Sequence, residues 1–470
     1  MTDLWRLTAG EAVRRLKRGE VTPLELVDAA AARIAAVEPR INAMPTLCLE
    51  RAREHARRLM AHPPAELPPH YLYGLPIAVK DNTDVAGVRC THGSRVYEHR
   101  IAPASDLVVQ RLEANGAVVI GKSNLPEFAA GGNTFNDVFG ATRNPWNTAL
   151  SAGGSSGGAA AALAAGEVWL ATGSDFGGSI RVPASFCSVV GMRPSPGRVP
   201  RVQKQPFSPL AVEGPMARTV ADCALMLDAE AGPHPLDPLS LPAPAESFSA
   251  AAARPRRPAR VAFSVDLGIA PAVDREVVAV CRAAVERLAA EGVAVEETHP
   301  PLADAVANYH VLRGAVFVAR VHELVGRHRA TLKPEIIGNY ERGLATPVAD
   351  VVAAEIAQGE VIRRMVTFMQ DYDLLLAPAA LCPPFPVAER YCAEVEGVAL
   401  PGYMDWMMLV CAITFTACPV LALPCGFTRD GRPVGLQVIG APRSEGTLFS
   451  FGAWLEQMWG LRDRLPVEPA

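Results

Sequence analysis

Two clusters of glycine and serine decide how this chain is interpreted, and they read Gly153-Gly154-Ser155-Ser156-Gly157-Gly158 and Gly173-Ser174-Asp175-Phe176-Gly177-Gly178-Ser179-Ile180-Arg181. Between them, residues 159–165 are almost all alanine, the residue with the highest helix propensity. Small side chains in this pattern allow a helix to approach a sheet very closely. We therefore predict a closely packed helix over 159–165, with glycine-rich turns on either side.

Apolar runs alternate with amphipathic segments on both sides of these clusters. Strands are predicted at 75–79 and 117–121, each a short apolar run. Farther along, 260–297 reads as a strand–helix–strand unit, and 420–439 reads as a terminal hairpin. This alternation indicates an α/β fold with a mixed or parallel sheet.

The chain is predicted to contain four segments. We expect helices packed on the core over 1–70, the core with the functional residues over 71–232, a divergent helical and α/β region over 233–380, and strands with a final helix over 381–470. The third segment opens with a connector rich in proline and alanine. We interpret it as a layer added to the main sheet that contributes to the substrate pocket.

The second cluster places a serine directly after two glycines. Glycines let backbone N–H groups turn toward one side, where they stabilise the negative oxygen of an acyl-transfer intermediate. Ser179 would then be the nucleophile, although a simple glycine turn explains the same residues equally well.

A serine nucleophile needs a base, and no histidine here stands in a local triad motif. Lys80 ends an apolar strand and can serve if burial keeps its amine neutral. Taken alone, a lysine after a strand is more often simply exposed.

Several further segments carry a resemblance to a known family. These are Gly74-Leu75-Pro76-Ile77-Ala78-Val79-Lys80-Asp81-Asn82, Arg143-Asn144-Pro145-Trp146, both glycine clusters, and Pro183-Ala184-Ser185-Phe186-Cys187-Ser188-Val189-Val190-Gly191. In order and spacing they resemble the amidase signature family, and the similarity is weakest over about 235–380. The resemblance implies that family's fold, a large mixed and twisted sheet covered by helices on both faces.

The resemblance also implies a Ser–cis-Ser–Lys triad. Ser179 matches the nucleophile, Ser155 the bridging serine and Lys80 the terminal base. In the family the bridging serine follows a cis peptide bond, which would be Gly154–Ser155 in this chain.

Further roles are carried over from the family by position. The backbone N–H groups of Phe176, Gly177, Gly178 and Ser179 match its oxyanion hole. Ser156, Asp175 and Arg181 match residues that support the loop, and Gly131, Gly132 and Asn133 match a loop that faces the substrate.

The implied activity is hydrolysis of a carboxylic amide through an acyl-enzyme on Ser179, extending to aryl amides, carbamates or esters. The chain resembles free-standing bacterial amidases, aryl acylamidases and urethanases. Three alternatives stay open: an amidotransferase-type A subunit that works with partners, a non-enzymatic family member, and an α/β-hydrolase esterase that uses the G-x-S-x-G pattern at 153–157.

Composition and motifs limit the classes of partner and cofactor that we expect. With 45 basic and 49 acidic residues the net charge is −4, which favours neither nucleic acid nor an anionic membrane. We find no dinucleotide or phosphate-binding motif and no H-E-x-x-H, so no cofactor and no metal are expected. Ten cysteines without a C-x-x-C pair indicate reduced thiols, and with no signal peptide evident we expect a cytoplasmic protein. A homodimer is compatible with this sequence.

One uncharged segment, 406–427, is long enough in principle to span a bilayer. Pro419 and Pro424 favour instead a buried helix that runs into a core strand. Just before it, the aromatic and thioether side chains of 403–408 can line an apolar pocket, but core packing is the favoured interpretation. Cys187 lies in an apolar run and is interpreted as a small buried hydrophobe.

Overall fold

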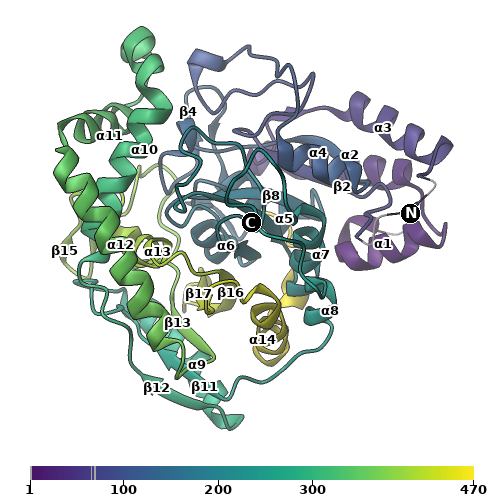
Figure 1. Cartoon of the computed structure of the whole chain (residues 1–470). Helices are drawn as coiled ribbons and strands as arrows, with labels where there is room; N and C mark the ends of the chain where they lie inside the picture. The colour runs from purple at the N-terminus through teal and green to yellow at the C-terminus, as the bar shows by residue number, and fades with distance from the viewer. Residues whose placement is uncertain (1–2, 65, 68–69) are drawn as a thin grey trace.

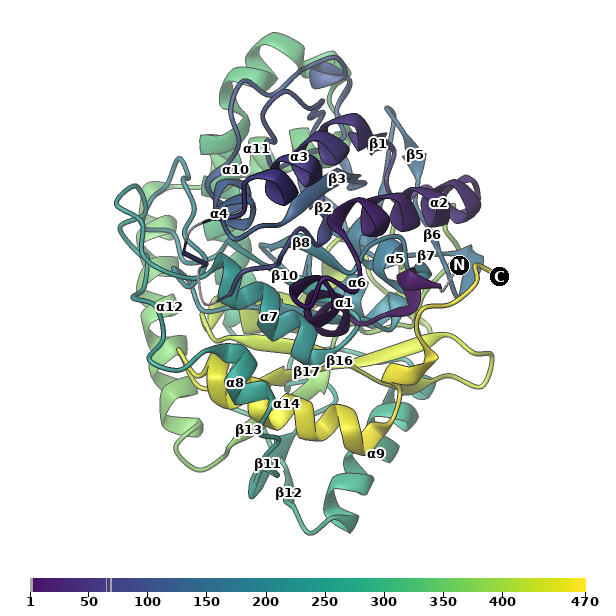
Figure 2. The ribbon, with the colours of Figure 1, turned by 90° about the vertical axis from the view of Figure 1, so that its right-hand side faces the viewer.

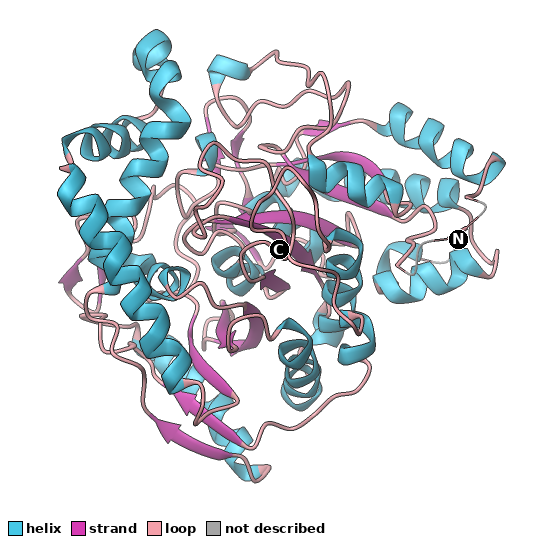
Figure 3. Ribbon diagram, in the orientation of Figure 1, coloured by secondary structure: helices cyan, strands magenta, loops and turns pink. Residues whose placement is uncertain are grey.

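The computed structural model describes residues 3–64, 66–67 and 70–470, and an eleven-stranded sheet runs through its centre (Figures 1 and 3). In spatial order its strands are β1 (Thr46–Leu47), β3 (Val118–Ser123), β2 (Pro76–Lys80), β8 (Leu170–Asp175), β10 (Val212–Ala217), β9 (Val190–Arg193), β16 (Val420–Phe427), β17 (Pro433–Ile439), β13 (Leu374–Pro378), β11 (Arg260–Phe263) and β12 (Ala294–Glu297). β2 pairs in parallel with β3 and β8, and β11 with β12 and β13, whereas the other neighbours are antiparallel. The sheet is therefore mixed, as predicted.

Helices cover both faces of this sheet. The helices are α1 (Ala9–Lys17), α2 (Pro23–Ile41), α3 (Leu49–Ala61), α4 (Leu107–Ala114), α5 (Gly157–Ala165), α6 (Arg181–Cys187), α7 (Val220–Glu230), α8 (Phe248–Ala252), α9 (Arg275–Ala290), α10 (Ala305–His328), α11 (Pro334–Ala345), α12 (Val348–Phe368), α13 (Met408–Phe415) and α14 (Glu445–Trp459). α5 and α6 contact each other on one face, and α7, α8 and α14 form a group on the other (Figure 2). α10, α11 and α12 lie together at the left of Figure 1, beyond α6 and α13.

Three short antiparallel pairs stand outside the main sheet. They are β4 (Phe135–Asn136) with β5 (Gly140–Ala141), β6 (Arg143–Asn144) with β7 (Asn147–Ser151), and β14 (Glu394–Val395) with β15 (Val398–Ala399).

The helix predicted after the first glycine cluster is α5, and all nine of its residues are buried. Its alanine and glycine side chains allow contact with β2, β3, β8 and β10 at close range. The closest approach is at Gly158, where an added Cβ would collide with the backbone nitrogen of Asn124 and stand 2.6 Å from the carbonyl oxygen of Ala43.

The middle region joins the sheet in a way that the sequence interpretation did not anticipate. β11 and β12 extend the edge of the main sheet through parallel pairing with β13, so they do not form a layer on top of it. The parallel pairing of β11 with β13 satisfies backbone N–H and C=O groups on the side of β11 that faces away from β12.

The uncharged segment 406–427 forms a short 3-10 turn, then α13, then β16. It is therefore a buried helix that leads into a core strand, as predicted. Throughout the described residues, no helix combines the length and the apolar character that a bilayer span requires.

Glycine-to-alanine exchanges in two helices are expected to have opposite effects. Gly158→Ala should lower the free energy of unfolding by about 1–3 kcal/mol, because the new methyl group meets rigid backbone. Gly338→Ala, at an exposed α11 position with nothing within 4 Å, should raise it by at most about 1 kcal/mol. Urea denaturation followed by circular dichroism measures both, and equal shifts would contradict the close packing of α5.

Candidate active site

Lys80 lies at the end of β2 with its side chain fully buried. Its Nζ is hydrogen-bonded to the hydroxyl oxygens of Ser155 and Ser156, each 2.8 Å away, and to that of Ser174 at 3.0 Å. The Lys80 backbone N–H donates to Thr172 Oγ1 at 3.0 Å, which ties β2 to β8 at this point. Three serine hydroxyls therefore surround the amine, and Ser174 is one that the sequence analysis missed.

The environment of Lys80 favours a neutral amine. Burial lowers its pKa from the ordinary value to about 7, although the charges of Glu213 and Asp175 act in the opposite direction. A neutral amine has one lone pair, so it can accept a proton from a neighbouring hydroxyl. Lys80 can therefore act as a base near neutral pH.

The first glycine cluster positions the two neighbouring serines. The peptide bond Gly154–Ser155 is cis, as the family resemblance implied. Ser156 precedes α5, and its backbone N–H donates to the carbonyl oxygen of Ser179 at 3.0 Å. This bond joins the two glycine clusters, so the Ser155 hydroxyl and the Ser179 backbone lie in one site.

Ser179 stands just before α6 and keeps 8% of its surface exposed. Within the part of the chain that the structure describes, its hydroxyl makes no hydrogen bond to protein atoms. The hydroxyl is therefore free to meet a ligand.

The loop at 176–179 has a fixed backbone. Gly178 has a left-handed φ of +96°, and a Cβ there would collide with Val410. A Cβ on Gly177 would collide with the Tyr309 hydroxyl, which donates to the carbonyl oxygen of Phe176 at 2.7 Å. Only glycine fits at these two positions.

The predicted oxyanion donors need one correction. The Gly178 N–H donates to Asp175 Oδ1 at 2.9 Å and is therefore directed away from a substrate. Among the described residues, the N–H groups of Phe176, Gly177 and Ser179 have no hydrogen-bond acceptor in the protein. The candidate oxyanion donors are therefore these three.

Asp175 anchors this loop from within the core. It forms ion pairs with Arg181 at 2.9 Å and Arg193 at 3.2 Å, and all three side chains are fully buried. It also accepts a hydrogen bond from the Ile180 N–H at 3.2 Å. Burial alone would raise the pKa of Asp175, but the charges of Arg181 and Arg193 outweigh it and hold the pKa well below its usual range.

Arg181 is fully engaged. Its Nη1 donates to Gln437 Oε1 and its Nη2 donates to Thr414 Oγ1, each at 2.6 Å. Arg181 therefore links the loop to β17 and α13. The sequence analysis identified Asp175 and Arg181 but missed Arg193, which is hidden in the otherwise apolar strand β9.

The loop predicted to face the substrate lies against the first glycine cluster. A Cβ on Gly154 would stand 2.9 Å from the carbonyl carbon of Gly132 and 3.0 Å from the carbonyl oxygen of Gly131. The Asn133 side chain is buried, accepts from Ser151 Oγ at 2.7 Å and donates to the Glu389 carbonyl at 2.7 Å. Its amide therefore holds neighbouring loops, and only the backbone of 131–132 stays a candidate for contact with substrate.

The space beside Gly132 is filled by the protein itself. A Cβ on Gly132 would collide with Trp406 and with Met407, and both of these side chains are buried in an apolar cluster. Core packing is thus the role of these two residues, as favoured from the sequence, and no room for a bulky group opens beside Gly132.

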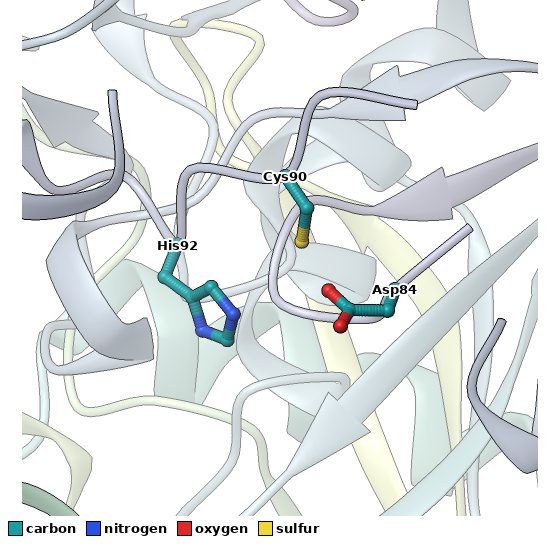
Figure 4. Close-up of side chains that lie close together, drawn as sticks. All are labelled: Asp84, Cys90 and His92. Carbon is teal, nitrogen blue, oxygen red and sulfur yellow. The ribbon is translucent and has the colours of Figure 1, made fainter. Parts of the chain in front are cut away.

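One group of side chains has the composition of a metal site. The ligand atoms of Asp84, Cys90 and His92 lie within 4.8 Å of one another, and the Asp84 and Cys90 side chains point toward each other (Figure 4). Arg100 already donates to both Asp84 oxygens, at 2.6 and 2.5 Å, and the Cys90 thiol donates to a backbone carbonyl at 3.2 Å. Burial raises the pKa of Cys90 to about 12. These protein partners fit a packing role better than metal binding.

The ten cysteines, all among the described residues, are free thiols. Cys187 is fully buried, as predicted. Burial raises the pKa of Cys187, which disfavours the thiolate that reacts as a nucleophile.

Comparisons with known proteins identify the family of this chain. A sequence model of the Amidase family matches residues 25–449. The chain is 36% identical to the glutamyl-tRNA(Gln) amidotransferase A subunit of Moorella thermoacetica, with 99% of each chain covered. It is 34% identical to an acylamidase of Rhodococcus erythropolis, with 99% of this chain and 98% of that protein covered.

A solved structure gives the same result. A bacterial aryl acylamidase of the amidase signature enzymes superposes with a TM-score of 0.90 at 28% identity, covering 98% of both chains. The predicted fold class is therefore confirmed, and so is the predicted family. The chain belongs to the amidase signature family of amide-hydrolysing enzymes.

Proposed function

We propose that this enzyme hydrolyses the C–N bond of acyl amides, aryl amides included, through an acyl-enzyme on Ser179. The observation that carries the proposal is the buried Lys80 amine held 2.8 Å from Ser155 Oγ, with burial lowering its pKa to about 7, in the glycine clusters that also carry Ser179. A base, a hydroxyl relay and a nucleophile are the groups that acyl transfer requires. The names of the acylamidase and aryl acylamidase relatives support the substrate class.

In the first half-reaction, Ser179 Oγ attacks the carbonyl carbon of the amide. Its proton passes to Ser155, while the Ser155 proton passes to Lys80 Nζ. The N–H groups of Phe176, Gly177 and Ser179 stabilise the negative oxygen that forms. The same relay then returns a proton to the departing nitrogen, the C–N bond breaks, and the amine leaves.

In the second half-reaction, water attacks the ester carbonyl of the acyl-enzyme. Lys80 again accepts a proton through Ser155, and the carboxylic acid leaves as Ser179 regains its hydroxyl. Ser156 and Ser174 hold the amine in place through both steps, because each is hydrogen-bonded to Nζ.

The amidotransferase-type alternative is that the chain is an A subunit that acts together with partner subunits. The relationship to amidotransferase A subunits makes glutamine a necessary member of any substrate panel. Ammonia release from glutamine by the chain alone, without turnover of anilides, would favour that alternative.

The assignment of Ser179 is tested by alanine exchange. Ser179→Ala should lower kcat for acetanilides, benzamides and aryl carbamates by at least about 10⁴-fold while the melting temperature stays within a few degrees. Product release measured by chromatography gives kcat. Ser450→Ala, on α14 away from the site, is the matched control. Equal turnover by the two variants would refute the proposed nucleophile.

The pH dependence follows from the lowered pKa of Lys80. Protonated Lys80 cannot accept a proton, so kcat/KM should fall about tenfold per pH unit below the pKa of about 7 and level off above it. Initial rates between pH 5 and 9 on a neutral anilide measure this profile. A flat profile across pH 6 to 8 would show that Lys80 is not the base.

The anchoring role of Asp175 is tested by removing its charge. Asp175→Asn leaves Arg181 and Arg193 buried without a counter-charge, so it should cost about 3–5 kcal/mol of unfolding free energy. It should also lower kcat, because the Gly178 hydrogen bond weakens. Glu297→Gln, which breaks an exposed pair with Arg282, should cost at most about 1 kcal/mol. A similar cost for both variants, measured by urea denaturation, would contradict the role of Asp175.

A further inference from the structure

A cavity of about 500 Å³ lies beside the candidate site. Its walls come from the segment after β2, from the stretch 200–213 and from α10. The wall residues that matter here are Asn82, Thr83, Arg201, Gln205, Glu213 and Arg320. Ser179 does not line it, so the cavity can receive only a part of the substrate that is remote from the scissile bond.

Three contacts connect this cavity to the catalytic residues. Asn82 and Thr83 follow Lys80 in the chain, separated from it only by Asp81. Glu213 faces Ser174 across the β10–β8 pair, and Ser174 is hydrogen-bonded to Lys80. On the third wall, Phe317 of α10 stacks on Phe176 of the oxyanion loop, with ring centroids 6.4 Å apart.

Arg320 is a cation of this cavity, and the charge of Glu213, which is not in an ion pair with it, opposes the lowering of its pKa. It lies on α10, one turn after Phe317, and is only partly exposed. Among the residues that the structure describes, it has no ion pair and no hydrogen bond. Its guanidinium carbon lies 6.0 Å from the centroid of the Phe317 ring, which is a cation–π contact. Burial lowers its pKa to about 10, so the guanidinium is still charged at neutral pH.

Arg201 is the second cation of the cavity, and its hydrogen bonding is incomplete. Its Nη2 lies 3.6 Å from Glu213 Oε1, but its Nε and Nη1 are buried without a partner among the described residues. Buried donors of this kind are costly unless a ligand or water satisfies them.

Glu213 does not cancel the two cations. Its one ion pair among the described residues is with Arg201, at 3.6 Å, so a single carboxylate stands against two guanidinium groups. The other acidic groups of the cavity are Asp106, which accepts from the Asp84 N–H at 2.7 Å, and the exposed Glu323. Lys204 and Arg327, both exposed, add positive charge to its lining.

We propose that this cavity binds a carboxylate carried by the amide substrate, remote from the scissile bond, with Arg320 and Arg201 as its ligands. A guanidinium presents paired donors that match the two oxygens of a carboxylate. The inference rests on the proposed function and adds a substrate class to it: anionic amides in preference to neutral amides of the same shape.

Matched substrate pairs test the preference directly. One pair has the charge on the acyl side, glutaric acid mono-4-nitroanilide against pentanoyl 4-nitroanilide. The other has it on the amine side, 4-acetamidobenzoate against 4-methylacetanilide. In at least one pair, kcat/KM of the wild type should be at least about tenfold higher for the carboxylate.

Arginine variants assign the preference to the cavity. Arg320→Met should reduce the ratio of kcat/KM between carboxylate and neutral substrate by about 10- to 100-fold, and Arg201→Met should reduce it in the same direction. Arg282→Met, on α9 and outside the cavity, should leave this ratio unchanged. A ratio near one in the wild type, or an equal ratio in wild type and Arg320→Met, would overturn the proposal.

A binding measurement separates this proposal from the proposed function. In the Ser179→Ala background, calorimetry gives the Kd of each uncleaved substrate, and adding Arg320→Met should weaken only carboxylate binding, by at least about tenfold. If neutral anilides are cleaved but carboxylate substrates show neither a higher kcat/KM nor a lower Kd, the cavity proposal fails and the hydrolase assignment stands. If carboxylates bind through Arg320 but no amide is cleaved, the hydrolase assignment fails and the anion site stands. Equal Kd values with and without Arg320 overturn the anion site.

Discussion

The site depends on the burial of one lysine amine without a carboxylate in contact with it. Lys80 Nζ meets only the hydroxyls of Ser155, Ser156 and Ser174 within hydrogen-bond distance. A neighbouring strand shows the contrast, because Lys122 Nζ is equally buried but lies 3.5 Å from Asp81 Oδ1 and donates to the Thr83 carbonyl at 2.7 Å. An ion pair would fix the proton on the amine, whereas hydroxyl partners let it leave.

Holding three hydroxyls around one amine requires backbones to approach more closely than side chains normally permit. α5 contributes nine buried residues, of which only Leu163 is larger than alanine. At Gly177 and Gly178 a Cβ would meet Tyr309 and Val410, so the loop is enclosed by the helices beyond it. The glycines are thus required for close packing as well as for the chemistry of the loop. For this reason the sequence alone could not distinguish a simple glycine turn from an oxyanion loop.

The sequence predicted the features that depend on residues near one another in the chain. It did not predict those that depend on contacts between residues far apart in the chain. The β2 strand, α5 and the hairpin of β16 and β17 follow from apolar runs and small residues, and the family resemblance pointed to Lys80, Ser155 and Ser179. Arg193 was missed because it lies in an otherwise apolar strand, and the role of Ser174 was missed because its cluster was interpreted as a turn although Ser174 belongs to β8. The position of β11 between β13 and β12 and the bond from Gly178 to Asp175 depend on pairings that form only in the folded chain.

The cations near the site differ in how many hydrogen-bond and ion-pair partners the protein gives them. This difference distinguishes cations that hold the structure from cations that can act on a substrate. Arg181 has a carboxylate, an amide oxygen and a hydroxyl as partners, so it can only hold the loop. Lys80 has hydroxyls and no carboxylate, so its proton is mobile. Arg320 has no polar partner among the described residues, and Arg201 keeps two buried donors unpaired. An unpaired buried donor is destabilising unless solvent or a ligand completes it, and these two arginines line the same cavity.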